Sequence, residues 1–199
     1  MRTAYVLTVN ENSERSQFTK QILETVGFYV KFIRCIPNKN KVLSNKYSML
    51  YIYHLIANGT DNWAYVFEDD INILEQINVS EIIKYETLTN VFFYLGVCIP
   101  SHFTKNNFFL YSNSIINGKK VYGIKGSVGG LHAIGISKIG AKMLLSFSNK
   151  FRHFKYMDMI LERFSQRHHA PVVRMDLESY IKGHRGIFFQ DRNKFPSSI

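Results

Sequence analysis

Three consecutive carboxylates, Glu68, Asp69 and Asp70, directly follow the apolar, strand-like segment 64–67, and an amide, Asn72, comes two positions later. Along an extended chain, Glu68, Asp70 and Asn72 project to one side and Asp69 projects to the other. Adjacent acids repel one another, so a fold gains little by placing them at a strand end. Mg²⁺ and Mn²⁺ prefer such oxygen ligands and bridge carboxylate to phosphate. We therefore expect a metal site here rather than a solvated acidic turn, with Asp70 as the principal ligand and Glu68 assisting.

The composition bounds the class of protein. With 199 residues, 46% of them hydrophobic, the chain can bury a full core and fits a single domain. The net charge of +10 attracts anions, whether nucleic acid, an acidic membrane surface or a phosphorylated small molecule, and does not choose between them. No apolar stretch reaches the length of a membrane span, and the N-terminus lacks a signal-peptide pattern, so we expect a cytoplasmic protein without a transmembrane segment. Cys35 and Cys98 are expected to be buried, reduced thiols.

Several enzyme classes lack their motifs in this chain. Neither G-x-G-x-x-G after the first strand nor G-x-x-x-x-G-K-[ST] occurs, which disfavours dinucleotide oxidoreductases and P-loop enzymes. The histidines His168 and His169 are adjacent rather than one helical turn apart, so they do not form a pair of zinc ligands. The glycine-rich segment 126–130 is either a mobile substrate loop or a plain connection.

The first third of the chain predicts a β-α-β-α-β unit. Its strands are expected at Thr3–Val9, Phe28–Ile36 and Trp63–Phe67, and its helices between Ser13 and Gly27 and over Ser44–Asn58. The helices show apolar residues at helical spacing, a capping residue before the first one and a glycine after each. Alternation of strands and helices through short links predicts a mostly parallel sheet flanked by helices.

The rest of the chain has a less regular pattern. We expect a short helix at Val79–Tyr85, strands at Val91–Val97, Leu131–Ile136 and Pro171–Met175, a hairpin of Phe108–Ser112 with Lys120–Lys125 around Asn117-Gly118, helices at Lys138–Ser148 and Tyr156–His168, and an irregular tail over Ser179–Ile199.

Six short segments, in this order, resemble the motifs of glycosyltransferase family 25, the lipopolysaccharide and collagen galactosyltransferases. They are Val6–Asn10 with Ser13-Glu14-Arg15, the "F-E-D-D" of 67–70, Leu95-Gly96-Val97-Cys98, Gly130–Ser137 with Gly140–Leu145, Met157-Asp158, and Phe189–Arg192 with Ser197-Ser198-Ile199. The resemblance covers most of the chain. It implies a GT-A type α/β fold in one glycosyltransferase domain, 1–199, with a donor-binding half at 1–75 and an acceptor half and tail at 76–199.

The resemblance also implies an activity and assigns residues to it. The enzyme would use Mn²⁺ or Mg²⁺ to transfer a sugar, such as galactose from UDP-galactose, to a glycan or lipid-linked acceptor with inversion, as in lipopolysaccharide biosynthesis. Asp158 is the expected catalytic base, with Asp191 in reserve. Apart from the resemblance, the basic context of His184, between Gly183 and Arg185, suits an anion or a second metal ligand, with an ordinary surface tail as the alternative. The residues expected to bind the donor are Thr8, Asn10, Arg15, Ser44, Lys46, Glu68, Asp69 and His132.

Two of these assignments have a purely structural alternative. Arg15 could be an ordinary residue of a first helical turn that points into solvent. A carboxylate such as Asp158 in the first turn of a helix is also favoured simply by the backbone dipole.

Two other functions compete with glycosyl transfer. One is a metal-dependent nuclease that holds two ions on the acidic triplet and grips phosphates with its basic surface. Such a site needs a lysine or a further acid close to the triplet. The segment that follows the triplet contains only one more carboxylate, the distant Glu75. The other is a basic nucleic-acid-binding module, which would have no need of the triplet. We therefore favour a nucleotide-sugar donor over nucleic acid as the partner.

Overall fold

A computed structural model describes residues 2–98, 103–125, 129–172 and 184–195. Its first third forms the expected β-α-β-α-β unit, with β1 at Arg2–Thr8, α1 at Glu14–Val26, β2 at Phe28–Arg34, α2 at Lys41–Asn58 and β3 at Trp63–Glu68. Ser13 caps α1 by accepting a hydrogen bond from the Ser16 backbone, and Gly27 ends the helix at a φ of 103°. The side chain of Asn40 caps α2, which therefore begins three residues before the predicted start.

The second half adds short elements around a second set of strands. They are β4 (Ile71–Ile73), α3 (Val79–Ile83), η1 (Lys84–Thr87), β5 (Phe92–Cys98), η2 (Lys105–Asn107), β6 (Phe108–Ile116), β7 (Lys119–Ile124), β8 (Gly129–Ser137), α4 (Lys138–Lys150), α5 (Met157–His168), β9 (Pro171–Val172), β10 (His184–Gly186) and β11 (Phe188–Gln190). The predicted hairpin is confirmed: Asn117 and Gly118 both have positive φ, which is the geometry of a tight hairpin turn.

A nine-stranded mixed sheet runs through the molecule in the order β2-β1-β3-β8-β5-β9-β7-β6, with β10 paired to β5. The strand β1 is parallel to both β2 and β3, and β5 is parallel to β9, whereas β8, β7 and β10 are antiparallel to their neighbours. Six of the nine strands therefore share one direction. This agrees with the predicted α/β class and its mostly parallel sheet flanked by helices.

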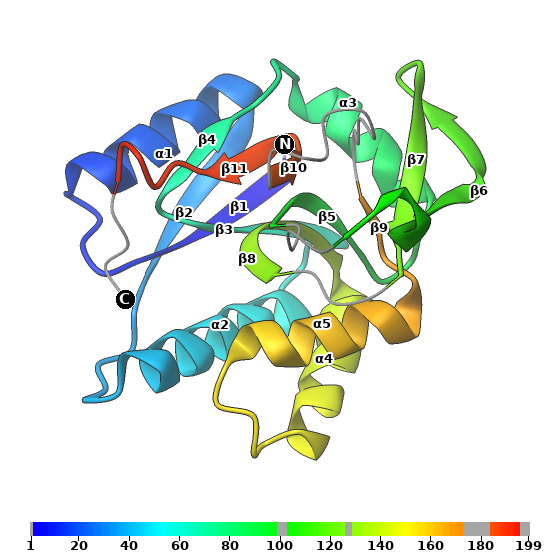
Figure 1. The fold of residues 1–199 in the computed structure, drawn as a ribbon. Coiled ribbons are helices and arrows are strands. Elements are labelled where there is room, and N and C mark those ends of the chain that lie inside the picture. Colours follow the sequence, from blue (N-terminus) through cyan, green and yellow to red (C-terminus); the bar gives the residue numbers. More distant parts are fainter. Residues whose placement is uncertain (1, 99–102, 126–128, 173–183, 196–199) are drawn as a thin grey trace.

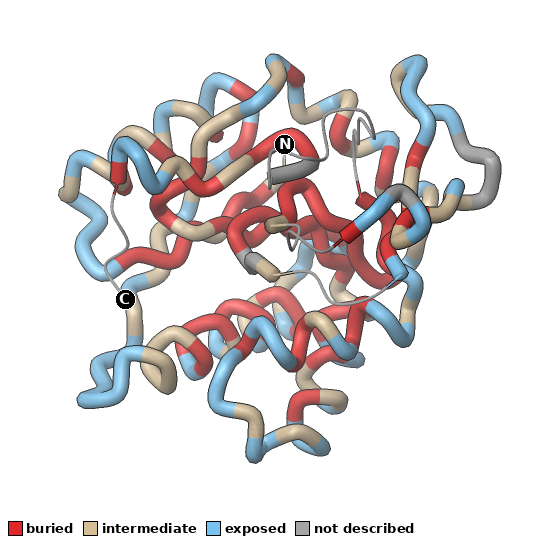
Figure 2. Tube along the Cα trace, in the orientation of Figure 1, coloured by how far each residue is buried: buried red, intermediate tan, exposed pale blue. Residues whose placement is uncertain are grey.

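Helices cover both faces of this sheet (Figure 1). The helices α2, α4 and α5 lie on one face, and α1 lies on the other beside a small sheet of β4 and β11. Each face has its own core: Met49 of α2 and Phe164 of α5 belong to one cluster, and Leu23 of α1 and Phe188 of β11 belong to the other. Figure 2 shows that buried residues follow the central strands and the inner sides of the helices.

The expected irregular tail is wrong for residues 184–190. The strand β10 pairs antiparallel with Gly96–Cys98 of β5, beyond the pairing of β5 with β9, and β11 pairs antiparallel with β4. Ile187 and Phe188 are fully buried, and the ring of Phe188 packs at 5.2 Å on that of Phe67. The expected loop at 126–130 is wrong for its last two residues, because β8 begins at Gly129 rather than at Leu131. Residues 126–128, 173–183 and 196–199 lie outside the described part of the chain.

No helix in the described ranges has the length and apolar character needed to cross a membrane.

Candidate functional site

A cavity of about 910 Å³ opens at the carboxyl ends of β1, β2 and β3. The first turns of α2 and α5 and the segment after β11 complete its wall. Its charged lining residues are four acids and four bases: Glu68, Asp69, Asp70, Asp158, Arg15, Arg34, Lys41 and Arg192. Parallel strands that bear helices on both faces leave such a crevice beyond their carboxyl ends, and ligands bind there in doubly wound folds.

The acidic triplet lines this cavity as a whole. The expectation that Asp69 faces away from its neighbours is wrong, because residues 69 and 70 form a turn between β3 and β4. Thr8 Oγ1 donates to Asp69 Oδ2 at 2.6 Å, and Ser16 Oγ donates to the same oxygen at 3.2 Å. These contacts fasten the end of β1 and the first turn of α1 to the end of β3.

Arg15 reaches into the cavity wall and pairs with two of the acids. Its Nη2 lies 2.6 Å from Asp69 Oδ1 and 3.3 Å from Asp70 Oδ2. Only 18% of its side chain is exposed, so the alternative that it points into solvent is wrong. The guanidinium neutralises part of the acidic cluster and holds it in place.

Asp70 combines burial with incomplete hydrogen bonding. The residue is 4% exposed, and its Oδ1 accepts no hydrogen bond from the described part of the chain. Burial raises the pKa of this carboxyl, and the charge of Arg15 partly opposes the rise. A buried oxygen acceptor without a donor is a site that a cation can occupy at low cost.

Glu68 is strongly perturbed by its surroundings in the cavity. Burial raises its pKa to about 8, and the neighbouring charges of Asp70 and Asp158 add to the rise. Gln190 Nε2 donates to its Oε2 at 2.5 Å, and Arg192 donates to Gln190 Oε1 at 3.2 Å. A divalent cation between Glu68 and Asp70 would relieve this crowding of carboxylates, so the residues present fit a metal. Across the described ranges, no three His, Cys, Asp or Glu side chains converge as a ready metal cluster.

Asp158 lines the same cavity as the triplet, and its charge acts on Glu68. It occupies the first turn of α5, beside Tyr156 and Met157, which also line the cavity. The N-cap residue, Tyr156, makes no capping hydrogen bond through its side chain. An exposed carboxylate at this helix end both complements the helix dipole and faces the space where a ligand would lie.

Two further predicted residues, Thr8 and Ser44, also line the cavity. The hydroxyl of Thr8 donates a hydrogen bond to Asp69, and Ser44 Oγ donates to the backbone oxygen of Ile36 at 2.5 Å. Both hydroxyls therefore serve first to shape the wall.

Lys46 and His132 do not reach the cavity. The amine of Lys46 donates to the backbone oxygens of Arg152 and Phe154 at 3.1 and 2.7 Å, which ties α2 to the α4–α5 connection. His132 is fully buried in β8 against β5, where a side chain at Gly96 would clash with its ring. Their roles in this fold are those of packing and clamping.

Asn10 and Asp191 also lie outside the cavity lining. Asn10 is exposed, and its side chain accepts from the backbone of Asn12. Asp191 accepts from Asn72 Nδ2 at 2.9 Å and from the Lys194 backbone at 3.1 Å, so it stabilises the turn after β11. The side chain of His184, the further predicted metal ligand, lies outside the described part of the structure.

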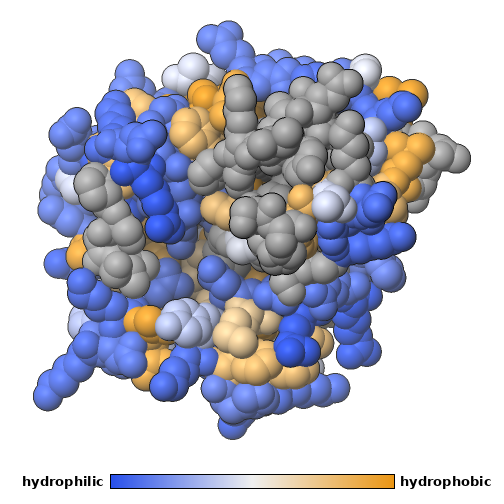
Figure 3. Space-filling view, in the orientation of Figure 1, coloured by the Kyte–Doolittle hydropathy of each residue, from blue (hydrophilic) through white to orange (hydrophobic). Residues whose placement is uncertain are grey.

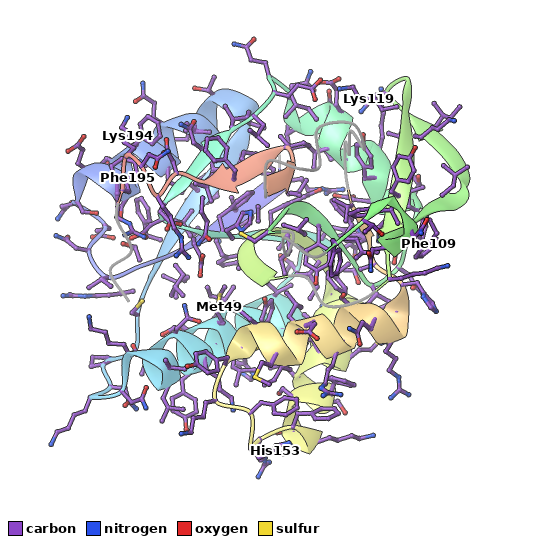
Figure 4. The ribbon with its side chains drawn as sticks, in the orientation of Figure 1. Met49, Phe109, Lys119, His153, Lys194 and Phe195 are labelled. Carbon is purple, nitrogen blue, oxygen red and sulfur yellow. The ribbon has the colours of Figure 1, made fainter. Side chains whose placement is uncertain are left out.

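Gln190 and Arg192 are cavity residues that sequence reasoning passed over in favour of Asp191. Alternation along an extended strand sets Gln190 and Asp191 on opposite sides, and this was the available signal. The turn that follows is anchored on α1, because Lys194 Nζ lies 3.5 Å from the centre of the Phe18 ring and Phe195 packs on the same ring (Figure 4). Arg192 is thereby held at the cavity.

Both cysteines line the same cavity as thiols. Burial raises the pKa of Cys35, and it raises the pKa of Cys98 to about 11. A thiol protonated at neutral pH is a poor nucleophile. The cavity therefore offers carboxylates rather than thiolates for chemistry.

No protein-family model matches this chain, and no curated protein matches it.

Proposed function

We propose that this chain is a metal-dependent glycosyltransferase with a GT-A type fold that binds a nucleotide-diphosphate sugar in the cavity. One observation carries the proposal: an acidic cluster and several basic side chains line the same cavity at the switch point of the sheet. From β1 the chain passes to β2 on one side and then to β3 on the other, while α1 and α2 cover opposite faces. Nucleotides bind at such a reversal of strand order.

The distribution of charge suits a diphosphate better than a plain anion or a plain cation. Glu68 and Asp70 contribute negative charges to the wall, and Arg34, Lys41 and Arg192 contribute positive charges to it. A diphosphate bound here needs both the acidic side chains, which would hold its metal ion, and the basic side chains, which would face its negative charge. The volume of about 910 Å³ lies within the usual range for small-molecule sites and suits a ligand of the size of a nucleotide sugar.

The roles of the residues follow from this arrangement. Glu68 and Asp70 would hold Mn²⁺ or Mg²⁺, which when bound neutralises charge on the diphosphate. Arg15 keeps the acids in place, and Thr8 and Ser44 shape the wall. Asp158 would accept the proton of the acceptor hydroxyl as a general base in an inverting transfer. The acceptor would be a glycan or a lipid-linked sugar, and galactose remains the sugar that we propose.

Thermal-shift measurements test this function. UDP, UDP-galactose and other sugar nucleotides are compared with and without Mn²⁺, and duplex and single-stranded DNA serve as controls. A ligand of the native state stabilises it by roughly 2.7 kcal/mol at a hundredfold excess over its Kd. We expect a shift with UDP compounds in the presence of Mn²⁺. A shift with DNA alone, together with DNA cleavage, would replace the proposal by a nuclease.

A further inference from the structure

The positive charge of this protein is concentrated on one face. The segments 41–58 and 138–169, which contain α2, α4 and α5, carry nine lysines and arginines but only two acids. They therefore hold seven of the ten net positive charges, and one of the two acids, Asp158, faces the cavity. All three helices lie on the same face of the sheet (Figure 1).

The most basic stretch is also partly apolar at its surface. Between residues 139 and 157 the chain has four lysines and arginines and no acid. The buried side of α4, which includes Ala141 and Leu144, faces the core. Its opposite side exposes Ile139 (57%) and Met143 (37%) one turn apart, with Lys142 between them. Exposed apolar side chains rimmed by polar ones are a feature of surfaces that meet a partner.

The connection from α4 to α5 extends this surface. It exposes Arg152, Lys155 and Tyr156, and the ring of Phe151 stacks on that of Phe154. His153, in the same connection, lies at the lower edge of the molecule (Figure 4). Figure 3 shows apolar side chains gathered among hydrophilic ones over the helices at this edge.

We propose that this face, consisting of Ile139, Lys142, Met143, Lys150, Arg152, Lys155 and Tyr156, docks on an anionic lipid bilayer. Lysine and arginine at an anionic leaflet each gain on the order of 1 kcal/mol, and exposed apolar side chains enter the interfacial layer. Nucleic acid fits less well, because aliphatic side chains such as Ile139 and Met143 gain nothing from a phosphate backbone. The charge of the face and its apolar residues thus favour the same partner.

The proposed docking face adjoins the cavity. Tyr156 belongs to both, since it lines the cavity and is 53% exposed. Lys46 fastens this connection to α2, whose first turn also lines the cavity. Docking would therefore hold the mouth of the cavity at the level of the lipid headgroups. The proposal concerns binding alone and stands independently of the proposed transfer reaction.

Co-sedimentation of the full chain with vesicles tests the docking. Phosphatidylcholine vesicles are compared with vesicles that also contain phosphatidylglycerol, at low and high salt. We expect binding to the anionic vesicles only, weakened by salt because the Coulomb attraction is screened. Binding to both kinds of vesicle alike, or to neither, would overturn the proposal, as would preferential binding to duplex DNA in the same buffer.

Three double variants, all at solvent-exposed positions, locate the surface. Lys142→Glu with Lys150→Glu should lower the affinity for anionic vesicles at least tenfold, and Ile139→Ser with Met143→Ser should lower it severalfold. The matched control is Lys119→Glu with Lys120→Glu, which changes the charge equally on a hairpin remote from His153 (Figure 4). Equal losses in the control and the first variant, or unchanged binding of the Ile139 and Met143 variant, would contradict the proposed face. An unchanged melting temperature of each variant shows that its fold is intact.

Discussion

Each carboxylate of the acidic triplet has a distinct environment, although the three are adjacent in the chain. Asp69 accepts hydrogen bonds from Thr8 and Ser16 and pairs with Arg15. Asp70, in contrast, has a buried oxygen that receives no hydrogen bond from the described residues. The types and spacing of these residues predicted a site but could not apportion the roles. That division depends on contacts between segments more than fifty residues apart.

Replacing Arg15 tests how much its ion pairs with Asp69 and Asp70 contribute to stability. Arg15→Ala leaves two buried carboxylates without their common cation, so we expect the free energy of unfolding to fall by about 3 kcal/mol. Lys20→Ala, on the same helix, removes only a surface pair with Glu24 and should change it by less than about 0.5 kcal/mol. Urea denaturation measures both values. Similar small losses for the two variants would show that the cluster does not need Arg15.

Glu68 should give the stability of the cation-free protein a characteristic pH dependence. Its pKa of about 8 in the folded chain exceeds the ordinary value of 4.5, so between these pH values the folded state holds a proton that the unfolded state has lost. The free energy of unfolding therefore falls as the pH rises through this window, by up to about 1.4 kcal/mol per pH unit. Urea titrations at several pH values in the presence of a chelator measure the slope. Glu68→Gln should flatten it, and a slope equal to that of the wild type would refute the assignment.

The role of Asp158 is a separate question from donor binding. If Asp158 is the general base, Asp158→Asn should bind a UDP-sugar normally but lose roughly 10²- to 10⁴-fold in turnover. Glu162→Gln, one turn further along the same helix, is the matched control because it does not line the cavity. Kinetics and calorimetry on the two variants separate the effects. A loss below about tenfold would leave Asp158 with helix-end stabilisation only.

The secondary-structure elements divide clearly into predictable and unpredictable ones. The caps Ser13 and Ser137 and the Asn117-Gly118 turn are local signals, and the structure confirms the elements that they delimit. The strands β4 and β11 are three residues long and form because they pair with each other across more than a hundred residues. No local pattern encodes such a pairing. The same pairing brings Gln190 and Arg192 to the cavity, so this part of the site was missed with it.

The segment after β11 offers a test of this long-range contribution. Arg192→Ala removes a positive charge from the cavity, and we expect the affinity for UDP to fall about tenfold with little change in melting temperature. Lys194→Ala, two residues away, removes no cavity charge, and Phe195 still packs on Phe18 to anchor the segment, so its affinity should stay near the wild-type value. Isothermal titration calorimetry distinguishes them. Equal affinities for the two variants would exclude the segment from the binding site.

The whole molecule joins a doubly wound sheet to a strongly asymmetric surface. The cavity opens where the strand order reverses, and the first turns of α2 and α5, which belong to the basic helical layer, line it. Composition predicted an anion-binding protein, but the net charge alone could not show that one helical layer carries most of it. The positions of α2, α4 and α5 on one face of the sheet supply that information.

The most direct test of the central claim is calorimetric titration of UDP into the protein with and without Mn²⁺, for the wild type and for Asp70→Asn. We predict that the wild type binds UDP tightly only with Mn²⁺ present and that Asp70→Asn loses this metal dependence while keeping its fold, as judged by circular dichroism. Binding of UDP by Asp70→Asn with the manganese dependence of the wild type, or no binding of any nucleotide by the wild type, would contradict the account.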